Sequence, residues 1–410
     1  MSDVINERKA TDAPASVEVP SYLPRRTVGQ LLRTDLGFLP VLFTLILIAL
    51  YFGFTTNGLF LTPRNLSNLV LQNITIGIIG LGSILVLLLG EIDLSVASVS
   101  TLCATIMGVL SERSGYPAWE AIAIALLFGA LAGFLNGVLI AYLRIPSFIV
   151  TLAASIGYAG LLLNLLSGQT TLIIHDNFIV SLANNYLPDI IGVGLPVVVL
   201  IIYLGALIFN FIRRRNAGLR TVSPVQLIVQ LALTVLVAAG TLILFESYLG
   251  VPQSIAILLG LIVIFWLILT KTAYGRHIYA VGGNNEAARR AGISVTWIRI
   301  SVFTLCSFLA AVAGVLAASR GLSVASQINP TLLLDAIAAA VIGGVSLFGG
   351  RGSVWSIILG MLIIGSLENG LDLKSQGTDV KQMVEGVVLI LAVAADAVIR
   401  RVQARSSSGR

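Results

Sequence analysis

The stretch Leu-Leu-Gly-Glu-Ile-Asp-Leu-Ser-Val, residues 87 to 95, places the carboxylates of Glu91 and Asp93 between two apolar segments. Both segments have the composition of membrane helices. An ionisable group at membrane depth costs roughly 2.5 to 3.5 kcal/mol on insertion scales, so a chain that keeps two together is expected to use them. The stretch therefore predicts a membrane protein with a transport pathway near this pair.

The composition of the whole chain supports this fold class. The 410 residues are 57% hydrophobic and 11% charged, whereas ordinary globular chains carry about 25% charged residues. The net charge of +6 does not indicate a nucleic-acid-binding protein, because the basic residues lie in loops between apolar runs. Cys103 and Cys306 lie within apolar runs, so neither a disulfide framework nor redox chemistry is expected.

Apolar runs of about 20 residues are long enough to cross the bilayer as helices. We predict an all-α polytopic protein with about twelve crossings, at residues 37–54, 66–89, 94–110, 119–143, 148–166, 192–211, 225–245, 252–270, 299–319, 334–350, 352–370 and 380–398. Arg351 splits the short tenth and eleventh segments. This hairpin therefore either borrows polar residues at both ends or contains broken, re-entrant helices. The twelfth segment carries Lys381, Glu385 and Asp396, which makes it the weakest.

The distribution of basic residues predicts the orientation. With the N-terminus inside, 20 of the 25 Lys and Arg residues fall in inner segments and five in outer loops, as the positive-inside rule requires. We therefore expect a cytoplasmic tail at 1–36, a transmembrane domain at 37–398 and a second cytoplasmic tail at 399–410.

The inner loop at 271–297 carries signals for a short helix. Asn284 or Asn285 is suited to cap that helix, Glu286 complements the positive end of its dipole, and Gly292 is suited to end it. A short capped helix on the cytoplasmic face offers a soluble partner a rigid feature to bind. The alternative is a solvated connector.

The motifs of several enzyme classes are missing from the sequence. No lysine follows a glycine, so the chain has no P-loop and no means of hydrolysing ATP alone. His175 and His277 lie in an outer and an inner loop, which excludes a zinc-type histidine cluster. No serine has the Gly-x-Ser-x-Gly context of acyl-transfer enzymes. We expect no catalytic residue, no metal and no cofactor bound by this chain.

Four motifs in order resemble the membrane permease subunits of bacterial sugar ABC importers of the ribose, galactose and xylose group. They lie at residues 91–96, 145–152, 275–292 and 334–353. The resemblance extends over about 37–400 and is strongest to the xylose type. Glu91 stands where ribose types usually have glycine, and a segment at about 192–248 adds two helices to a ten-helix core.

The resemblance implies that transport is shared among several separate proteins. Such permeases form a homodimer around one path in the bacterial inner membrane, receive sugar from an extracytoplasmic binding protein, and are driven by a cytoplasmic ATPase that uses ATP and Mg²⁺. The expected substrate is a pentose such as D-xylose. The coupling segment would comprise Gly275, Arg276, Asn284, Glu286, Ala287, Ala288, Arg289, Arg290 and Gly292.

Six residues are candidates for the translocation path or its gate: Glu91, Asp93, Asn136, Phe148, Asp335 and Asn369. Purely structural roles are the alternative for most of them. The two aspartates are suited to cap helices, the two asparagines to form interhelical hydrogen bonds, and Phe148 to begin an apolar helix.

The same residues indicate a faint internal repeat. Asp93 is followed by small residues and later by Asn136, and Asp335 is likewise followed by small residues and Asn369. The predicted topology gives the two units opposite orientations, as in inverted-repeat transporters.

Two rival functions remain open from the sequence. An ion-coupled secondary transporter would use Glu91, Asp93 or Asp335 as proton sites and would need no partner. An ABC permease for amino acids is the other rival.

Overall fold

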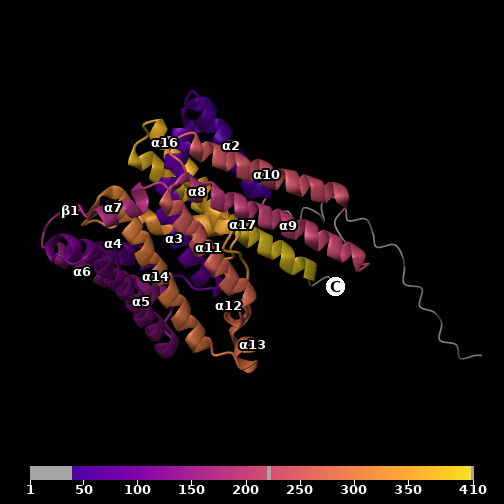
Figure 1. Cartoon of the computed structure of the whole chain (residues 1–410). Coiled ribbons are helices and arrows are strands. Elements are labelled where there is room, and N and C mark those ends of the chain that lie inside the picture. The colour runs from indigo at the N-terminus through magenta and orange to yellow at the C-terminus, as the bar shows by residue number, and fades with distance from the viewer. Residues whose placement is uncertain (1–38, 219–222, 408–410) are drawn as a thin grey trace, which may run out of the picture. The chain divides into compact units, whose positions relative to one another are not determined.

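The computed structural model describes residues 39–218 and 223–407 (Figure 1). The predicted N-terminal tail at 1–36 and the last residues of the predicted C-terminal tail lie outside the described residues. The predicted all-α class is confirmed in its main features, because nearly every described segment between the turns is helical. The long helices are α2 (Leu39–Thr55), α3 (Pro63–Leu88), α4 (Val96–Gly108), α5 (Ala118–Leu143), α6 (Ser147–Leu166), α9 (Gly194–Asn216), α10 (Pro224–Glu246), α11 (Gln253–Lys271), α14 (Val295–Gly321), α15 (Pro330–Ile342), α16 (Ser356–Leu373) and α17 (Thr378–Ser407).

Short helices connect these long ones: η1 (Leu59–Leu61), a π-helical turn (Val109–Arg113), α7 (Asn177–Asn184), α8 (Asp189–Gly192), α12 (Ala273–Gly283) and α13 (Asn285–Arg290). Figure 1 shows α12 and α13 following one another below α11.

Each predicted crossing corresponds to one of the long helices, but not every helix has the length and apolarity of a full crossing. Among the described residues, eight candidate spans meet both criteria: α3, α5, α6, α8 with α9, α10, α11, α14 and α16. Helices α2 and α15 are apolar but shorter. The chain is thus a polytopic membrane protein.

The hairpin around Arg351 contains a short first helix and a non-helical connection. Helix α15 starts at Pro330 rather than residue 334 and borrows polar residues there, with the Asn329 side chain accepting a hydrogen bond from the Thr331 amide at 3.1 Å. The helix ends at Ile342, and residues 343–355 form a non-helical connection before α16. Thirteen helical residues span only about 20 Å, so α15 alone is shorter than the bilayer core.

The helix α14 lies at the centre of the packing and contacts α5, α3 and α4. Glycines permit these contacts. A Cβ atom added at Gly133 on α5 would collide with the Phe303 carbonyl oxygen on α14, and one added at Gly314 on α14 would collide with the Ser100 carbonyl oxygen on α4. Small residues let membrane helices approach until their backbones touch.

A two-stranded antiparallel sheet was not predicted. Strand β1 (Thr171–Ile173) pairs with β2 (Ser323–Ala325), and Leu172 lies opposite Val324. Each strand has three residues, too few to show an alternating pattern, and about 150 residues separate the partners. The pair joins the segment that follows α6 to the segment that follows α14.

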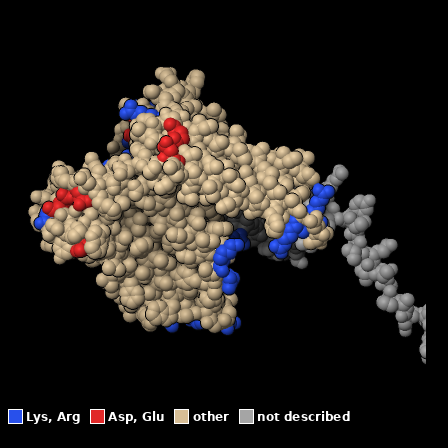
Figure 2. All heavy atoms as spheres, viewed as in Figure 1, with Lys and Arg blue, Asp and Glu red and all other residues tan. Residues whose placement is uncertain are grey.

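Charged side chains gather near the ends of helices. Figure 2 shows a mostly uncharged face, with acidic groups near its top and left and basic groups at its lower edge and at the far end of α9. The last turn of α9 carries Arg213, Arg214 and Arg215, and α13 carries Arg289 and Arg290. Helices α9 and α10 expose most of their apolar side chains, as expected of helices that face lipid.

Substitution of Gly133 by alanine is expected to lower the stability of the protein. Its new methyl group would force α5 away from α14, and overpacking of this kind costs about 1–3 kcal/mol. Gly157→Ala on α6 is the matched control, because a Cβ atom there meets nothing within 4 Å. The melting temperature of each purified variant in detergent tests this. Equal melting temperatures for both variants would contradict the packing described.

Candidate functional site

The segment between α3 and α4 carries a buried ion pair. The Oε1 atom of Glu91 lies 2.6 Å from the Nε atom of Arg299 on α14, and their side chains are 12% and 24% exposed. The sequence singled out Glu91 but not its partner, which lies 208 positions away. The predicted crossings 66–89 and 299–319 place both residues at the inner ends of helices, and that shared position was the available signal for the pair.

Asp93 belongs to a buried polar network rather than to a helix cap. Its Oδ1 atom accepts hydrogen bonds from the Ser95 amide at 2.8 Å and the Ser95 hydroxyl at 2.6 Å. Asn136 donates to the Ser95 hydroxyl at 3.2 Å, and Tyr158 donates to Asn136 at 3.3 Å. The network therefore links the start of α4 to α5 and α6. The Oδ2 atom of Asp93 is buried and makes no hydrogen bond within residues 39–218 and 223–407.

Helix capping, the alternative role for both aspartates, is not what the structure shows. Ser95 is the N-cap of α4 and Asn329 is the N-cap of α15, so Asp93 lies before its helix and Asp335 lies inside one. Asp favours a cap because its side chain satisfies free amides in the first turn. Neither carboxylate contacts such amides, because Asp93 is bound within its own turn and Asp335 follows the first turn of α15.

The first two turns of α6 hold the segment that carries both carboxylates. The Ser147 hydroxyl accepts a hydrogen bond from the Ile92 amide at 3.4 Å, and the Thr151 hydroxyl accepts one from the Leu94 amide at 3.0 Å. Non-helical backbone at membrane depth needs such partners. Two of the predicted family motifs, at 91–96 and 145–152, are thus in direct contact.

A cavity of about 500 Å³ opens beside Glu91. It lies between the end of α5 and the starts of α6 and α14, and its lining includes Phe148, Arg144, Arg289 and Arg299. Its volume is in the range of small-molecule sites. Phe148 is half exposed, so its ring offers an apolar surface next to charged groups.

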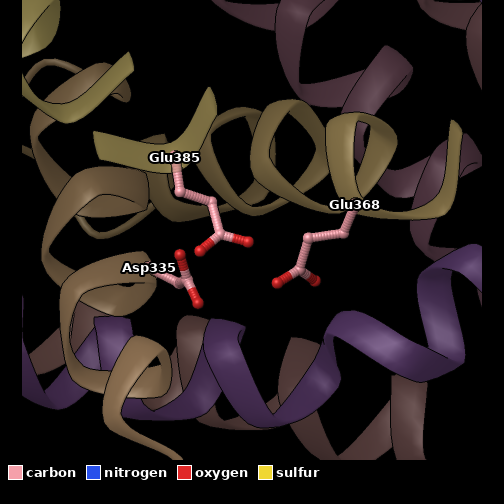
Figure 3. A group of neighbouring side chains, drawn as sticks. All are labelled: Asp335, Glu368 and Glu385. Atoms are coloured by element: carbon pink, nitrogen blue, oxygen red, sulfur yellow. The ribbon is translucent and has the colours of Figure 1, made fainter. Parts of the chain in front are cut away.

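Asp335 lies in a cluster of three carboxylates within the helices (Figure 3). Carboxylate oxygens of Asp335 on α15, Glu368 on α16 and Glu385 on α17 lie within 4.8 Å of one another. A neighbouring cavity of about 250 Å³ is lined by Thr331, Asp335, Gln382 and Glu385. The sequence did not predict this cluster, because its members come from three helices and share no spacing.

Asn369 hydrogen-bonds to none of the other candidates within residues 39–218 and 223–407. Its Oδ1 atom accepts a hydrogen bond from Asn65 at 2.8 Å, and its Nδ2 atom donates to Gln72 at 3.4 Å, both on α3. The six predicted path residues therefore do not form a single hydrogen-bonded site. Glu91, Asp93, Asn136 and Phe148 lie around the start of α4, while Asp335 and Asn369 lie elsewhere.

The predicted short helix in the 271–297 loop is confirmed as α13. The Asn284 side chain is its N-cap and accepts a hydrogen bond from the Ala287 amide at 2.9 Å. Gly292 follows with a positive φ of 83°. Ala288 is buried, whereas Glu286, Ala287, Arg289 and Arg290 are exposed. The sequence missed α12, whose N-cap is Thr272.

Two tyrosines fix α12 to the rest of the chain. The Tyr274 hydroxyl hydrogen-bonds with that of Ser301 at 2.7 Å, and the Tyr279 hydroxyl donates to the Gly352 carbonyl at 2.9 Å. Burial raises the pKa of both Tyr274 and Tyr279 above the ordinary value. Both hydroxyls are therefore protonated at neutral pH, and Tyr279 keeps the hydrogen atom that it donates.

These features define a polytopic membrane protein with buried polar networks between its helices. A family model described as the permease component of branched-chain amino acid transport systems matches residues 65–393. The chain is 36% identical to the xylose transport system permease protein XylH of Escherichia coli K12, over 87% of this chain and 91% of that protein. It is also 30% identical to the fructose import permease protein FrcC of Rhizobium meliloti, over 96% of this chain and 95% of the relative.

A third relative is named for the transport of another sugar, ribose. The ribose import permease protein RbsC of Bacillus subtilis 168 is 32% identical, over 83% of this chain and 87% of that protein. No solved structure matches the chain. The chain therefore belongs to the family of permease components of sugar ABC importers. Members of this family are transport subunits and not enzymes, and their partners are an ATPase and a binding protein.

The ion pair leads to a prediction about stability. Glu91→Gln or Arg299→Gln alone leaves one charge buried without a partner, at a cost of about 3 kcal/mol. The double variant leaves neither charge and is expected to lose less stability than the two single variants combined.

Chemical unfolding of the four proteins in detergent measures this difference. Arg289→Gln is the control, because Arg289 and Glu286 form a 3.9 Å pair with both side chains exposed, and such pairs contribute about 0–1 kcal/mol. Additive losses in the double variant would show that Glu91 and Arg299 do not interact.

Proposed function

We propose that this chain forms the translocation path for a monosaccharide, a pentose such as D-xylose, and couples that path to a separate ATPase. The observation that carries the proposal is the position of α12 and α13. The two helices present an exposed, capped surface and contact the segments that bear the buried polar groups. A partner that binds α13 is thus connected to the path by rigid elements.

The choice of a sugar rests on the relatives. The three relatives above are named for xylose, fructose and ribose transport, although the description of the family model refers to branched-chain amino acids. The added segment at about 192–248, which the sequence associated with the xylose type, contains α9 and α10. A pentose is the substrate that fits these observations best.

The proposed assembly has two copies of the chain around one path. Both termini are cytoplasmic, the 271–297 loop faces the ATPase, and the opposite face receives sugar from an extracytoplasmic binding protein. The basic residues in the last turn of α9 and on α13 support this orientation. ATP and Mg²⁺ bind to the partner.

The polar residues around the start of α4 are proposed to line the path or its gate. A sugar needs donors and acceptors that match its hydroxyl groups, and Glu91, Asn136 and the Asp93 Oδ2 atom offer them. Phe148 is positioned beside Glu91 to contact an apolar sugar face. Asp335 and Asn369 are proposed to line the path at other depths in the membrane.

The inverted repeat is proposed to relate α4 and α5 to α15 and α16. In each unit a 13-residue helix precedes a longer one that carries a buried asparagine. The hydrogen bonds differ, because Asn136 binds Ser95 within its own unit whereas Asn369 binds α3. The two units are therefore alike in the order of a shorter and a longer helix, but not in the hydrogen bonds of their asparagines.

Substrate choice is tested by competition. Vesicles containing the permease, its ATPase and the neighbouring binding protein are expected to take up labelled D-xylose. Excess unlabelled D-xylose should suppress this uptake, whereas leucine should leave it unchanged. A binding protein that binds an amino acid and no monosaccharide would exclude the proposed substrate.

The ATPase contact is tested by charge exchange on α13. Glu286→Lys combined with Arg290→Glu keeps the net charge but inverts the exposed pattern, and like charges across an interface cost several kcal/mol. We expect the ATPase that co-purifies to fall by at least about tenfold. Replacement of Arg213, Arg214 and Arg215 by glutamine at the end of α9 is the control. Undiminished co-purification of the α13 variant would remove the proposed contact.

A further inference from the structure

Three backbone segments meet at the end of α12. They are residues 88–90 at the end of α3, residues 282–283 of α12, and residues 348–350 in the connection between α15 and α16. The Gly350 amide donates a hydrogen bond to the Leu88 carbonyl at 2.9 Å. We call these eight positions the glycine junction, because Gly90, Gly282, Gly283, Gly349 and Gly350 all lie in it.

The contacts in the glycine junction are between backbones. A Cβ atom added at Gly282 would collide with the Leu88 carbonyl oxygen and lie 2.8 Å from the Gly350 nitrogen. One added at Gly349 would lie 2.7 Å from the Gly282 carbonyl oxygen and 2.8 Å from the Gly90 nitrogen. The end of α12 thus touches both other segments, without side chains in between.

The reason that no side chain fits differs between Gly282 and the other glycines of the junction. Gly90, Gly349 and Gly350 have φ values of 75°, 85° and 73°, in the left-handed region that disfavours other residues. Gly282 is helical, so only the close contact excludes a side chain. Its neighbour Gly283 is in the same helix, and a Cβ atom there meets nothing within 4 Å.

The glycine junction connects the exposed α13 to the segment that carries Glu91 and Asp93 and to the connection between α15 and α16. Residues 88–90 lead directly to Glu91 and Asp93. Residues 348–350 belong to the connection that the Tyr279 hydroxyl also holds through Gly352. Packed backbones have low compressibility and transmit displacement, whereas long side chains absorb it by changing rotamer. A shift of α12 therefore moves both segments together.

We propose that Gly282 is a positioning residue for energy coupling. Its contact carries the movement of α12 and α13 to the inner ends of α3 and of the α15–α16 connection at the same time. This inference rests on the proposed function, in which the ATPase binds α13. It adds the route by which that binding changes the path, and the route requires two conformations that the ATPase distinguishes.

The test compares Gly282→Ala with Gly283→Ala in the complete importer reconstituted in vesicles. Three quantities are measured: the amount of ATPase that co-purifies, the rate of ATP hydrolysis, and the sugar transported per ATP. We expect Gly282→Ala to retain its ATPase and to hydrolyse ATP, while sugar transported per ATP falls by about tenfold. Gly283→Ala should match the wild type in all three.

Two outcomes for a folded Gly282→Ala protein would overturn the proposal. One is an unchanged ratio of sugar to ATP. The other is loss of the ATPase itself, which would make the contact part of docking rather than transmission. Failure of the proposed function looks different, because the wild-type chain would then not retain the ATPase.

Tyr279→Phe provides the test if Gly282→Ala does not fold. The substitution removes only the hydroxyl that binds Gly352 and leaves the ring in place. Sugar transported per ATP is expected to fall by about threefold to fivefold, with the ATPase retained. An unchanged ratio would show that the connection at residues 348–352 does not need to follow α12.

Discussion

Close contact between backbones at glycine residues is the interaction on which the rest of this structure depends. Apolar side chains gain little from leaving lipid for one another, so membrane helices associate through van der Waals packing and hydrogen bonds. Here α5 meets α14 at Gly133, α14 meets α4 at Gly314, and α16 meets α15 at Gly360. These contacts leave α14 surrounded by helices and set where its polar residues lie. The same type of contact recurs at the end of α12, where it joins three segments instead of two.

The packed helices place charged and polar groups where lipid alone would exclude them. Arg299 on α14 neutralises Glu91 in the break between α3 and α4. The hydroxyls of α6 satisfy the amides of that break. An interruption of two helices that holds an ion pair and hydrogen-bonded amides next to a cavity is well suited to a path for a polar solute. The exposed α13 is the surface that we propose for the energy-providing partner, consistent with a family whose members do not hydrolyse ATP.

The sequence predicted the helices well because their signal is local. Apolar runs, the cap at Asn284 and the glycine at 292 are each readable within a few residues. Contacts between distant segments were missed for the opposite reason: the Glu91–Arg299 pair, the three carboxylates around Asp335, and the β1–β2 pairing each join parts of the chain that no spacing relates. The capping alternative at Asp335 fails for a local reason. Aspartate is a common cap, but Asn329 and Pro330 start the helix one turn earlier.

The energy source of transport is the most direct test of this account. Sugar accumulation is measured in sealed vesicles that contain either the purified chain alone or the chain with its ATPase and binding protein. A protonophore is added to each to abolish ion gradients. The account predicts ATP-dependent accumulation by the full complex that persists with the protonophore, and no accumulation by the chain alone. Accumulation by the isolated chain, abolished by the protonophore, would contradict it.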